Sequence, residues 1–228
     1  MSLPPVQAVL LDAGGVLLDL DYAFLARLLA ARGVDAALDR LAEAESYART
    51  AIDRRVREGG RVGEAWRDYF RILLARVSTP AGEVEGTIDA LWETHQRSGL
   101  WTRAIDGAPQ TLRALRQAGF RLGVVSNAEG RVARDLDNAG YGALFETVVD
   151  SHLVGVEKPD PAIFRIALER MGIDPRATLF LGDVPAVDVA GAKAAGLRPV
   201  LLDRHDLYPD LDVPRLRSIT ELPAYLGA

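Results

Sequence analysis

The stretch VQAVLLDAGG at residues 6–15 decides how this chain folds. Its apolar run, Val6–Leu11, stops at an aspartate, and a pair of glycines follows shortly after. Such a short apolar run is typical of a central strand in a parallel sheet, which is buried on both faces. We expect four further strands from similar runs at Arg121–Val125, Thr147–Val149, Thr178–Leu181 and Pro199–Leu202.

Amphipathic stretches lie between these runs, and each is followed by a glycine. They cover Gln110–Ala118, Arg131–Ala139, Ala162–Met171 and Val187–Ala195. A glycine just past a helix readily takes the left-handed conformation that closes it. Strands that alternate with helices predict an α/β fold, a Rossmann-like parallel sheet of five or more strands with helices on both faces.

Residues 20–100 differ from the rest, because their apolar residues recur at helical spacing throughout, as at Phe24, Leu28 and Leu29. This spacing predicts a small all-helical domain inserted after the first strand. A single continuous domain with a helical side is the alternative. The expected domains are an α/β core at residues 1–19 and 101–228 and a helical domain at residues 20–100.

Composition narrows the class of protein further. The 228 residues carry a net charge of −5 and have a mean hydropathy of +0.05, values that indicate a globular protein. There is no cysteine, so disulfides, thiolate nucleophiles and cysteine metal sites are excluded. The negative charge and the lack of a basic stripe argue against a nucleic acid partner.

No part of the sequence predicts a membrane segment. The longest apolar runs fall well short of the roughly 20 residues that a membrane span needs. The first residues lack the basic region of a signal peptide. We therefore expect a cytoplasmic protein.

Polar side chains stand where the predicted strands end. Asp12, Ser126 and Asp183 each follow or end an apolar run, Lys158 lies in the loop after the third run, and Asp188 comes five residues after Asp183. Because ligands bind at the carboxyl ends of parallel strands, we expect these side chains to meet at one edge of the sheet. Each taken alone could be a helix cap or a solvated side chain.

Such a group of side chains suits one kind of chemistry. Carboxylates that gather without a cation repel each other, and their hard oxygens suit Mg²⁺, which shares its shell with substrate phosphate. A carboxylate there can act as a nucleophile on phosphorus. A serine hydroxyl, backbone amides and a lysine would hold the other phosphate oxygens.

Four motifs make the sequence resemble the haloacid dehalogenase-like (HAD) hydrolase superfamily. In chain order they are DAGGV at residues 12–16, VVSN at 124–127, KPDPAIF at 158–164 and GDVPAVD at 182–188. The resemblance covers the whole chain, and the insert at residues 20–100 lies where that family has its helical cap.

The resemblance implies a role for each site residue. Asp12 is the nucleophile, and it holds Mg²⁺ together with Asp183 and the carbonyl of Gly14. Asp188 supports the metal. The set that receives and neutralises the phosphate consists of Ser126, Asn127, Lys158 and the glycine turn of Gly14 and Gly15.

Position 14 departs from the family pattern. Phosphatases of this family usually have a second aspartate two residues after the nucleophile, as the general acid, and here that residue is Gly14. The loss of such a group typically costs roughly 10²–10⁴-fold in rate. Residues that could replace it are Asp19, Asp21, Glu129, His95 and His152.

The sequence leaves three hypotheses for the function of this protein. The leading hypothesis is a Mg²⁺-dependent phosphatase of a small phosphorylated metabolite, such as a sugar phosphate. Gly14 also allows a non-catalytic or weakly active binding or regulatory protein. A haloacid dehalogenase is the third, although the family resemblance implies that dehalogenases lack the metal aspartate that Asp183 supplies here.

Overall fold

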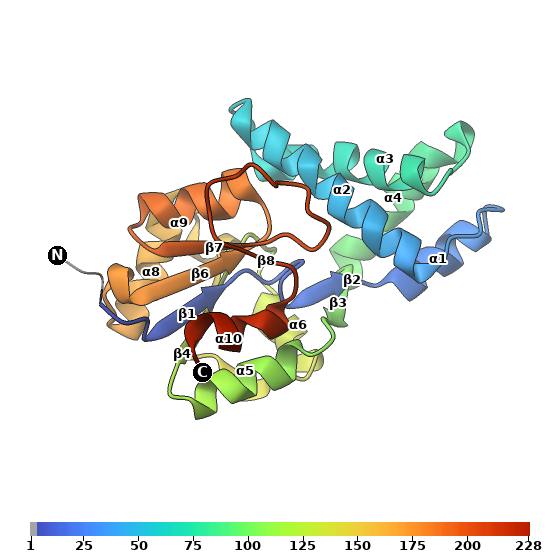
Figure 1. The fold of residues 1–228 in the computed structure, drawn as a ribbon. Helices are drawn as coiled ribbons and strands as arrows, with labels where there is room; N and C mark the ends of the chain where they lie inside the picture. The colour runs from blue at the N-terminus through green and yellow to red at the C-terminus, as the bar shows by residue number, and fades with distance from the viewer. Residues whose placement is uncertain (1–3) are drawn as a thin grey trace. The chain divides into compact units, whose positions relative to one another are not determined.

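The chain folds into two compact units (Figure 1). The computed structural model describes residues 4–228. The core unit holds the chain up to Asp19 together with Thr102–Ala228, and the helical unit holds Leu20–Trp101. Two short paired strands, β2 (Leu18–Leu20) and β3 (Trp101–Ala104), carry the chain from one unit to the other.

Six parallel strands form the sheet of the core unit, in the order β5-β4-β1-β6-β7-β8. They are β1 (Ala8–Leu11), β4 (Arg121–Ser126), β5 (Thr147–Asp150), β6 (Thr178–Gly182), β7 (Arg198–Leu202) and β8 (Arg215–Leu216). The predicted α/β fold class is confirmed. The sequence does not predict β8, because two residues are too few to show a hydrophobic pattern.

Helices cover both faces of this sheet. They are α5 (Ala108–Gln117), α6 (Val132–Asn138), α7 (Ser151–Val154), α8 (Pro161–Met171), α9 (Ala190–Ala194) and α10 (Leu222–Leu226). Figure 1 shows α8 and α9 on one side of the sheet and α5 and α10 on the other. Ala8 and Leu10, alternate residues of β1, belong to one buried cluster with Phe164 of α8, as the two-residue period of a strand requires.

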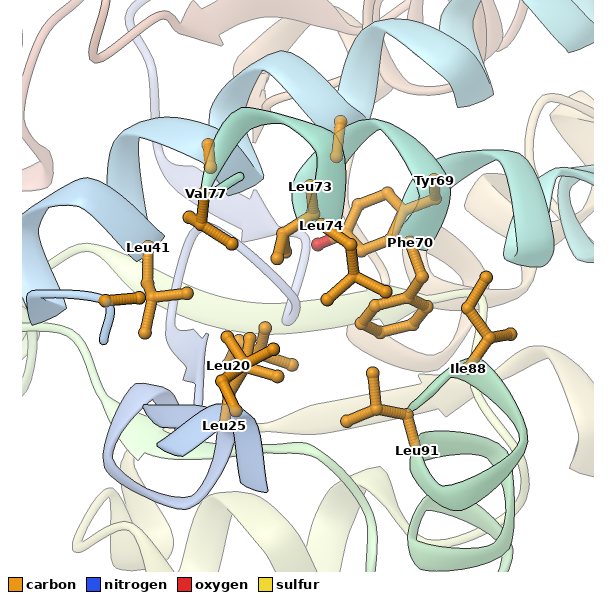
Figure 2. Packing of buried hydrophobic residues seen from close by; sticks show 14 of the residues in the cluster. Leu20, Leu25, Leu41, Tyr69, Phe70, Leu73, Leu74, Val77, Ile88 and Leu91 are labelled. Atoms are coloured by element: carbon orange, nitrogen blue, oxygen red, sulfur yellow. The ribbon is translucent and has the colours of Figure 1, made fainter. Parts of the chain in front are cut away.

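The helical unit is built from four helices around an apolar interior (Figure 2). They are α1 (Tyr22–Ala30), α2 (Leu38–Arg57), α3 (Trp66–Arg76) and α4 (Ala81–Ser98). Leu25, Leu41, Phe70 and Leu91 come from different helices and are all fully buried. Within residues 4–228, no helix is long and apolar enough to cross a membrane.

A buried carboxylate links the elements of the helical unit. Glu45 of α2 accepts hydrogen bonds from the hydroxyls of Tyr22 and Tyr69 and from the indole of Trp101, and it pairs with Arg49. Burial opposes ionisation, but Arg49 and these donors outweigh it and hold the pKa of Glu45 below its usual value. This charge is therefore fully matched inside the unit.

Candidate active site

Two aspartates end neighbouring strands at the centre of the sheet. Asp12 directly follows β1 and Asp183 directly follows β6, while Asp188 lies one short turn further on. Carboxylate oxygens of these three residues all lie within 4.8 Å of one another. The two acids expected at strand ends, Asp12 and Asp183, thus form one cluster with Asp188.

Lys158 brings a cation into this cluster. Its Nζ lies 2.8 Å from Oδ1 of Asp12 and 2.8 Å from Oδ1 of Asp188. The side chain is 1% exposed, and burial alone would lower its pKa. The two carboxylates outweigh burial and raise the pKa of Lys158 above its usual value, so the ammonium stays charged.

The pKa of the Asp12 carboxyl is raised above its usual value. Burial raises the pKa of its carboxyl, Asp188 raises it further, and Lys158 only partly opposes this. The Asp12 side chain nevertheless remains 14% exposed, whereas that of Asp188 is 1% exposed. Asp12 is therefore the more reachable of the two carboxylates that pair with Lys158.

Asp188 is fixed by the backbone that precedes it. Its Oδ2 accepts hydrogen bonds from the N–H groups of Asp183 at 3.0 Å and Val184 at 2.9 Å. This inward turn replaces the first part of the helix expected at Val187–Ala195 by a wide π-helical turn, Pro185–Val189. A Cβ at Gly182 would lie 2.3 Å from the Asp188 side chain, so the close fit requires glycine at position 182.

The loop after β4 contributes Ser126 and Asn127. Ser126 is buried at the end of the strand. The Asn127 side chain donates to the Lys158 carbonyl at 2.9 Å and accepts from the Lys158 N–H at 2.7 Å. The sequence does not predict these contacts, by which the Asn127 side chain holds the loop of Lys158.

The turn after Asp12 uses its two glycines differently. Gly15 has a φ of 79°, in the left-handed region that favours glycine, and its N–H donates to the Leu18 carbonyl. Gly14 is not among the described residues with a positive φ. A side chain at position 14 is therefore compatible with the backbone conformation there.

The acids fit a bound Mg²⁺ ion. Carboxylate oxygens are the hard ligands that Mg²⁺ prefers, and the cluster of Asp12, Asp183 and Asp188 contains no histidine or cysteine that would favour zinc. A divalent cation would also relieve the repulsion that raises the pKa of Asp12.

Comparison with known proteins agrees with this arrangement of motifs. A family model described as haloacid dehalogenase-like hydrolase matches residues 6–196. The chain belongs to this family. The resemblance seen in the sequence is thereby confirmed.

Two relatives illustrate how far the similarity extends. The mouse haloacid dehalogenase-like hydrolase domain-containing protein 3 is 32% identical over 138 residues, 60% of this chain and 55% of the mouse protein. A phosphoserine phosphatase of Thermus thermophilus is 33% identical over 181 residues, 64% of this chain and 71% of that enzyme. The match thus spans little more than half the length of the mouse relative.

Solved structures share the fold over almost the whole chain. A magnesium-bound HAD hydrolase of Bacillus subtilis is 22% identical, with a TM-score of 0.70 and coverage of 99% of this chain and 100% of its own. An L-2-haloacid dehalogenase is 24% identical, with a TM-score of 0.68 and the same coverage. At these identities the likeness concerns the fold.

The acids that could replace the missing one in this HAD-like hydrolase already have other contacts. Asp19 pairs with Arg204 at 3.0 Å, and Asp21 caps α1 by accepting from the Phe24 N–H. Glu129 lies 3.4 Å from Arg131.

The two candidate histidines, His95 and His152, also lie beside other residues of their own units. His95 is buried among aromatic rings of the helical unit, where its ring centre lies 4.8 Å from that of Trp66. His152 is exposed in α7 and lies close to Gly130. Of the candidates in the core unit, Asp19, Glu129 and His152 are not among the residues that the structure shows in the cluster around Lys158.

A further carboxylate at a strand end escapes the sequence analysis. Asp150 ends β5, next to Ser126 in the register of the sheet, and is 3% exposed. The signal that identifies Asp12, a polar residue after a buried run, is present at Asp150 too, but no motif of the family resemblance includes it.

Proposed function

We propose that this HAD-like hydrolase is a Mg²⁺-dependent phosphatase of a small phosphorylated metabolite. The observation that carries the proposal is the cluster of Asp12, Asp183 and Asp188 around the ammonium of Lys158. The phosphatases among its relatives, including the phosphoserine phosphatase, support this class of reaction. A sugar phosphate is one substrate of suitable size, and the cytoplasm is the proposed location.

Each residue of the candidate site has a defined part in the proposed reaction. Asp12, which is less buried than Asp188, attacks phosphorus, and the oxygen of the leaving alcohol departs with the electron pair of the broken bond and takes a proton from water. Water then hydrolyses the aspartyl phosphate and regenerates Asp12. Lys158 neutralises charge on Asp12 and on the transferring phosphoryl group.

Ser126 and the backbone of Asn127 hold the remaining phosphate oxygens, with the glycine turn at Gly14 and Gly15 allowing close approach. Asp12, Asp183 and the Gly14 carbonyl would hold Mg²⁺, with Asp188 in support. Bound there, Mg²⁺ supplies positive charge that stabilises the transferring phosphoryl group.

A non-catalytic or weakly active binding protein is the second candidate. The observation that favours it is Gly14, which leaves no carboxyl group two residues after Asp12. Such a protein would bind phosphorylated ligands at the same residues without turning them over. A dehalogenase is disfavoured because Asp183 and Asp188 would then have no role as metal ligands.

The deciding experiment is a screen of phosphate esters with and without Mg²⁺, using the wild type and the Asp12→Asn variant. The proposal expects turnover that needs both Mg²⁺ and Asp12. Tight binding of an ester without phosphate release favours the binding protein, and release of halide from a 2-haloacid favours the dehalogenase.

A further inference from the structure

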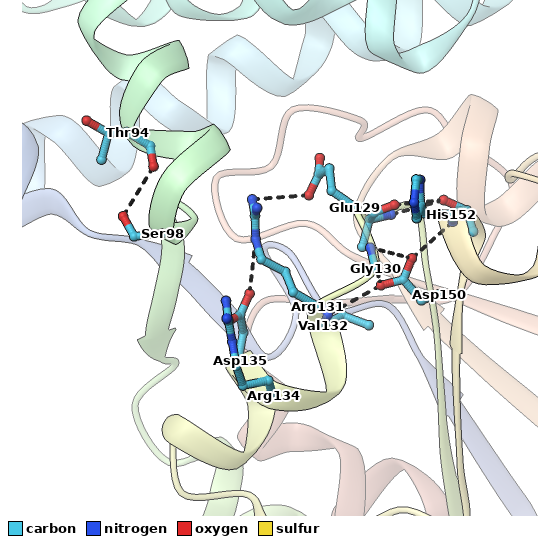
Figure 3. Close-up of polar contacts among 12 residues, drawn as sticks. Thr94, Ser98, Glu129, Gly130, Arg131, Val132, Arg134, Asp135, Asp150 and His152 are labelled. Carbon is cyan, nitrogen blue, oxygen red and sulfur yellow. Dashed lines mark hydrogen bonds and ion pairs between the residues drawn. The ribbon is translucent and has the colours of Figure 1, made fainter.

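The loop that follows β4 is held by hydrogen bonds to two side chains, Asp150 at the end of β5 and Ser151 directly after it. The Asp150 carboxylate accepts hydrogen bonds from the Gly130 N–H, at 3.0 and 2.9 Å to its two oxygens, and from the Val132 N–H at 3.3 Å (Figure 3). Gly130 lies in the segment that connects Ser126 to α6, and Val132 is the first residue of α6. A buried carboxylate therefore grips the far end of this loop.

Ser151 grips the near end of the same loop. Its Oγ accepts from the Ala128 N–H at 3.1 Å and lies 3.2 Å from the Ala128 carbonyl, to which it can donate. Ala128 is the residue directly after Asn127. Asp150 and Ser151 together thus bind backbone groups on three of the five residues from Ala128 to Val132.

These contacts exceed what a helix cap needs. Asp150 does cap α7, because its Oδ1 accepts from the His152 N–H at 3.0 Å. One such bond is enough for an N-cap. The bonds to Gly130 and Val132 instead tie β5 to the loop after β4, although about 20 residues separate them in sequence.

Hydrogen bonds connect the loop held by Asp150 and Ser151 to Lys158. Asn127, next to the segment that Asp150 and Ser151 hold, exchanges two hydrogen bonds with the backbone of Lys158. The chain between Ser151 and Lys158 is only α7 and a short connection. The loops that carry Asn127 and Lys158 are therefore hydrogen-bonded to each other, and Asp150 and Ser151 hold the first of them.

We infer that Asp150 and Ser151 are positioning residues that fix the phosphate-receiving backbone at Ser126 and Asn127. This inference rests on the proposed function, because it assumes that the loop receives phosphate. Neither side chain needs to touch the substrate. Their effect is on how the loop receives the phosphoryl group: lost backbone contacts weaken phosphate binding, and a displacement of about 1 Å can also lower the rate by about 10²-fold.

The test uses the full chain with Mg²⁺ and inorganic phosphate as the probe. Asp150→Asn keeps the shape of the side chain but replaces one acceptor by a donor that opposes the backbone N–H groups. We expect its Kd for phosphate, measured by calorimetry, to rise by about 10-fold or more. Ser151→Ala removes a single side-chain grip and should give a smaller rise in the same direction.

The matched control is Asp174→Asn. Asp174 also accepts from a backbone N–H, that of Arg176 at 2.8 Å, but it precedes β6 and so lies at the opposite edge of the sheet. Its variant should bind phosphate as the wild type does. A residue that serves stability alone would lower Tm without changing the Kd for phosphate at a temperature where both proteins are folded.

Hydrogen exchange of the Gly130 and Val132 amides gives a readout that is independent of ligand. Faster exchange in Asp150→Asn, with the rest of the core unit unchanged, supports the grip. Unchanged exchange, or an unchanged Kd in a folded variant, overturns the inference. If Asp150→Asn does not fold, Ser151→Ala decides by its own Kd, where a rise supports the inference and an unchanged value overturns it.

The outcome also separates this inference from the proposed function. Suppose that the wild type hydrolyses esters and that Asp150→Asn binds phosphate with an unchanged Kd. The proposed phosphatase function is then supported, and the positioning role of Asp150 is overturned. A wild type that neither binds phosphate nor hydrolyses esters removes both.

Discussion

The core unit and the helical unit each bury a cluster of charged side chains, but the charges are matched in only one of them. In the helical unit, the Glu45 carboxylate has four hydrogen-bonding partners, one of them the cation Arg49, and its pKa is lowered. In the core unit, three carboxylates gather within 4.8 Å, and the pKa of Asp12 is raised even though Lys158 is in contact with it.

This is the difference expected between a structural cluster and a candidate metal-binding cluster. A buried carboxylate with a complete set of donors is stabilised as it stands and has little to gain from a ligand. A cluster with more negative than positive charge is stabilised when a cation joins it. Perturbed acids of this second kind are found disproportionately at active sites.

The largest effect is expected from Asp12→Asn. The amide cannot attack phosphorus, so turnover should fall by at least about 10⁴-fold, as for the loss of other enzymatic nucleophiles. The free energy of unfolding at pH 7 without Mg²⁺ should be equal to or above that of the wild type. The reason is that a raised carboxyl pKa lowers stability as pH rises through it, and the amide removes this cost. Urea unfolding and steady-state kinetics measure the two quantities, and a destabilised variant would argue against the raised pKa.

Lys158→Met should have the next largest effect. It removes the only cation that the structure shows paired with Asp12 and Asp188 among residues 4–228, so turnover should fall by about 10²–10³-fold. Removal of one partner from a buried ion pair also lowers stability, by roughly 3–5 kcal/mol.

The chain offers one matched control for this change. Lys193, the other lysine, is exposed on α9, and Lys193→Met should leave both rate and Tm near the wild-type values. Added Mg²⁺ should restore much of the lost stability of Lys158→Met, because it supplies the missing positive charge. If Mg²⁺ does not change the Tm of Lys158→Met, the acid cluster does not carry an excess of negative charge that a cation stabilises.

Gly14→Asp should have a smaller effect, confined to one class of substrate. The added carboxyl group can protonate a poor leaving group, so hydrolysis of alkyl phosphates should rise by about 10-fold, below the roughly 10²–10⁴-fold limit for a general acid. Aryl phosphates need no such proton and should change little. Gly14 lacks the positive φ that side chains resist, and Gly14→Asn is the control of equal size without acidity. An unchanged alkyl-to-aryl ratio would mean that another residue already donates the proton.

Glu45→Gln should affect stability and leave turnover per folded molecule unchanged. The free energy of unfolding at pH 7 should fall by roughly 3 kcal/mol, because Arg49 loses its buried partner. Since the folded pKa of Glu45 is lowered, its contribution is complete above the unfolded pKa of about 4.3 and is lost as pH falls below it. Urea unfolding at several pH values should therefore show the two proteins converging below about pH 4. Glu43→Gln, an exposed change on the same helix, is the control.

The sequence predicts the core of this fold because buried strands leave a local signal. Each of the five expected strands overlaps an observed one, and the acids at their ends meet as expected. The helix expected at Val187–Ala195 is present, but its first part is a π-helical turn, Pro185–Val189, in which the Asp188 side chain bonds the backbone of Asp183 and Val184. Local hydrophobic periodicity carries no information about such a bond.

Contacts between distant residues explain what the sequence does not reveal. Glu45 stands in an amphipathic helix like many surface acids, and only the folded unit brings Tyr22, Tyr69 and Trp101 to it. The side chain of Asn127 likewise finds the backbone of Lys158 across 31 residues. These pairings depend on the tertiary structure, which single-sequence patterns do not encode.

The burial of Lys158 has a practical consequence for chemical labelling. Reagents that acylate amines need an accessible, unprotonated nitrogen, and the Lys158 nitrogen is neither exposed nor easily deprotonated. Lys193 is the only other lysine in the chain, and it is exposed. Of the two lysines, only Lys193 on α9 should therefore react with an amine-directed fluorophore or surface linker, which leaves Lys158 and the acid cluster unmodified.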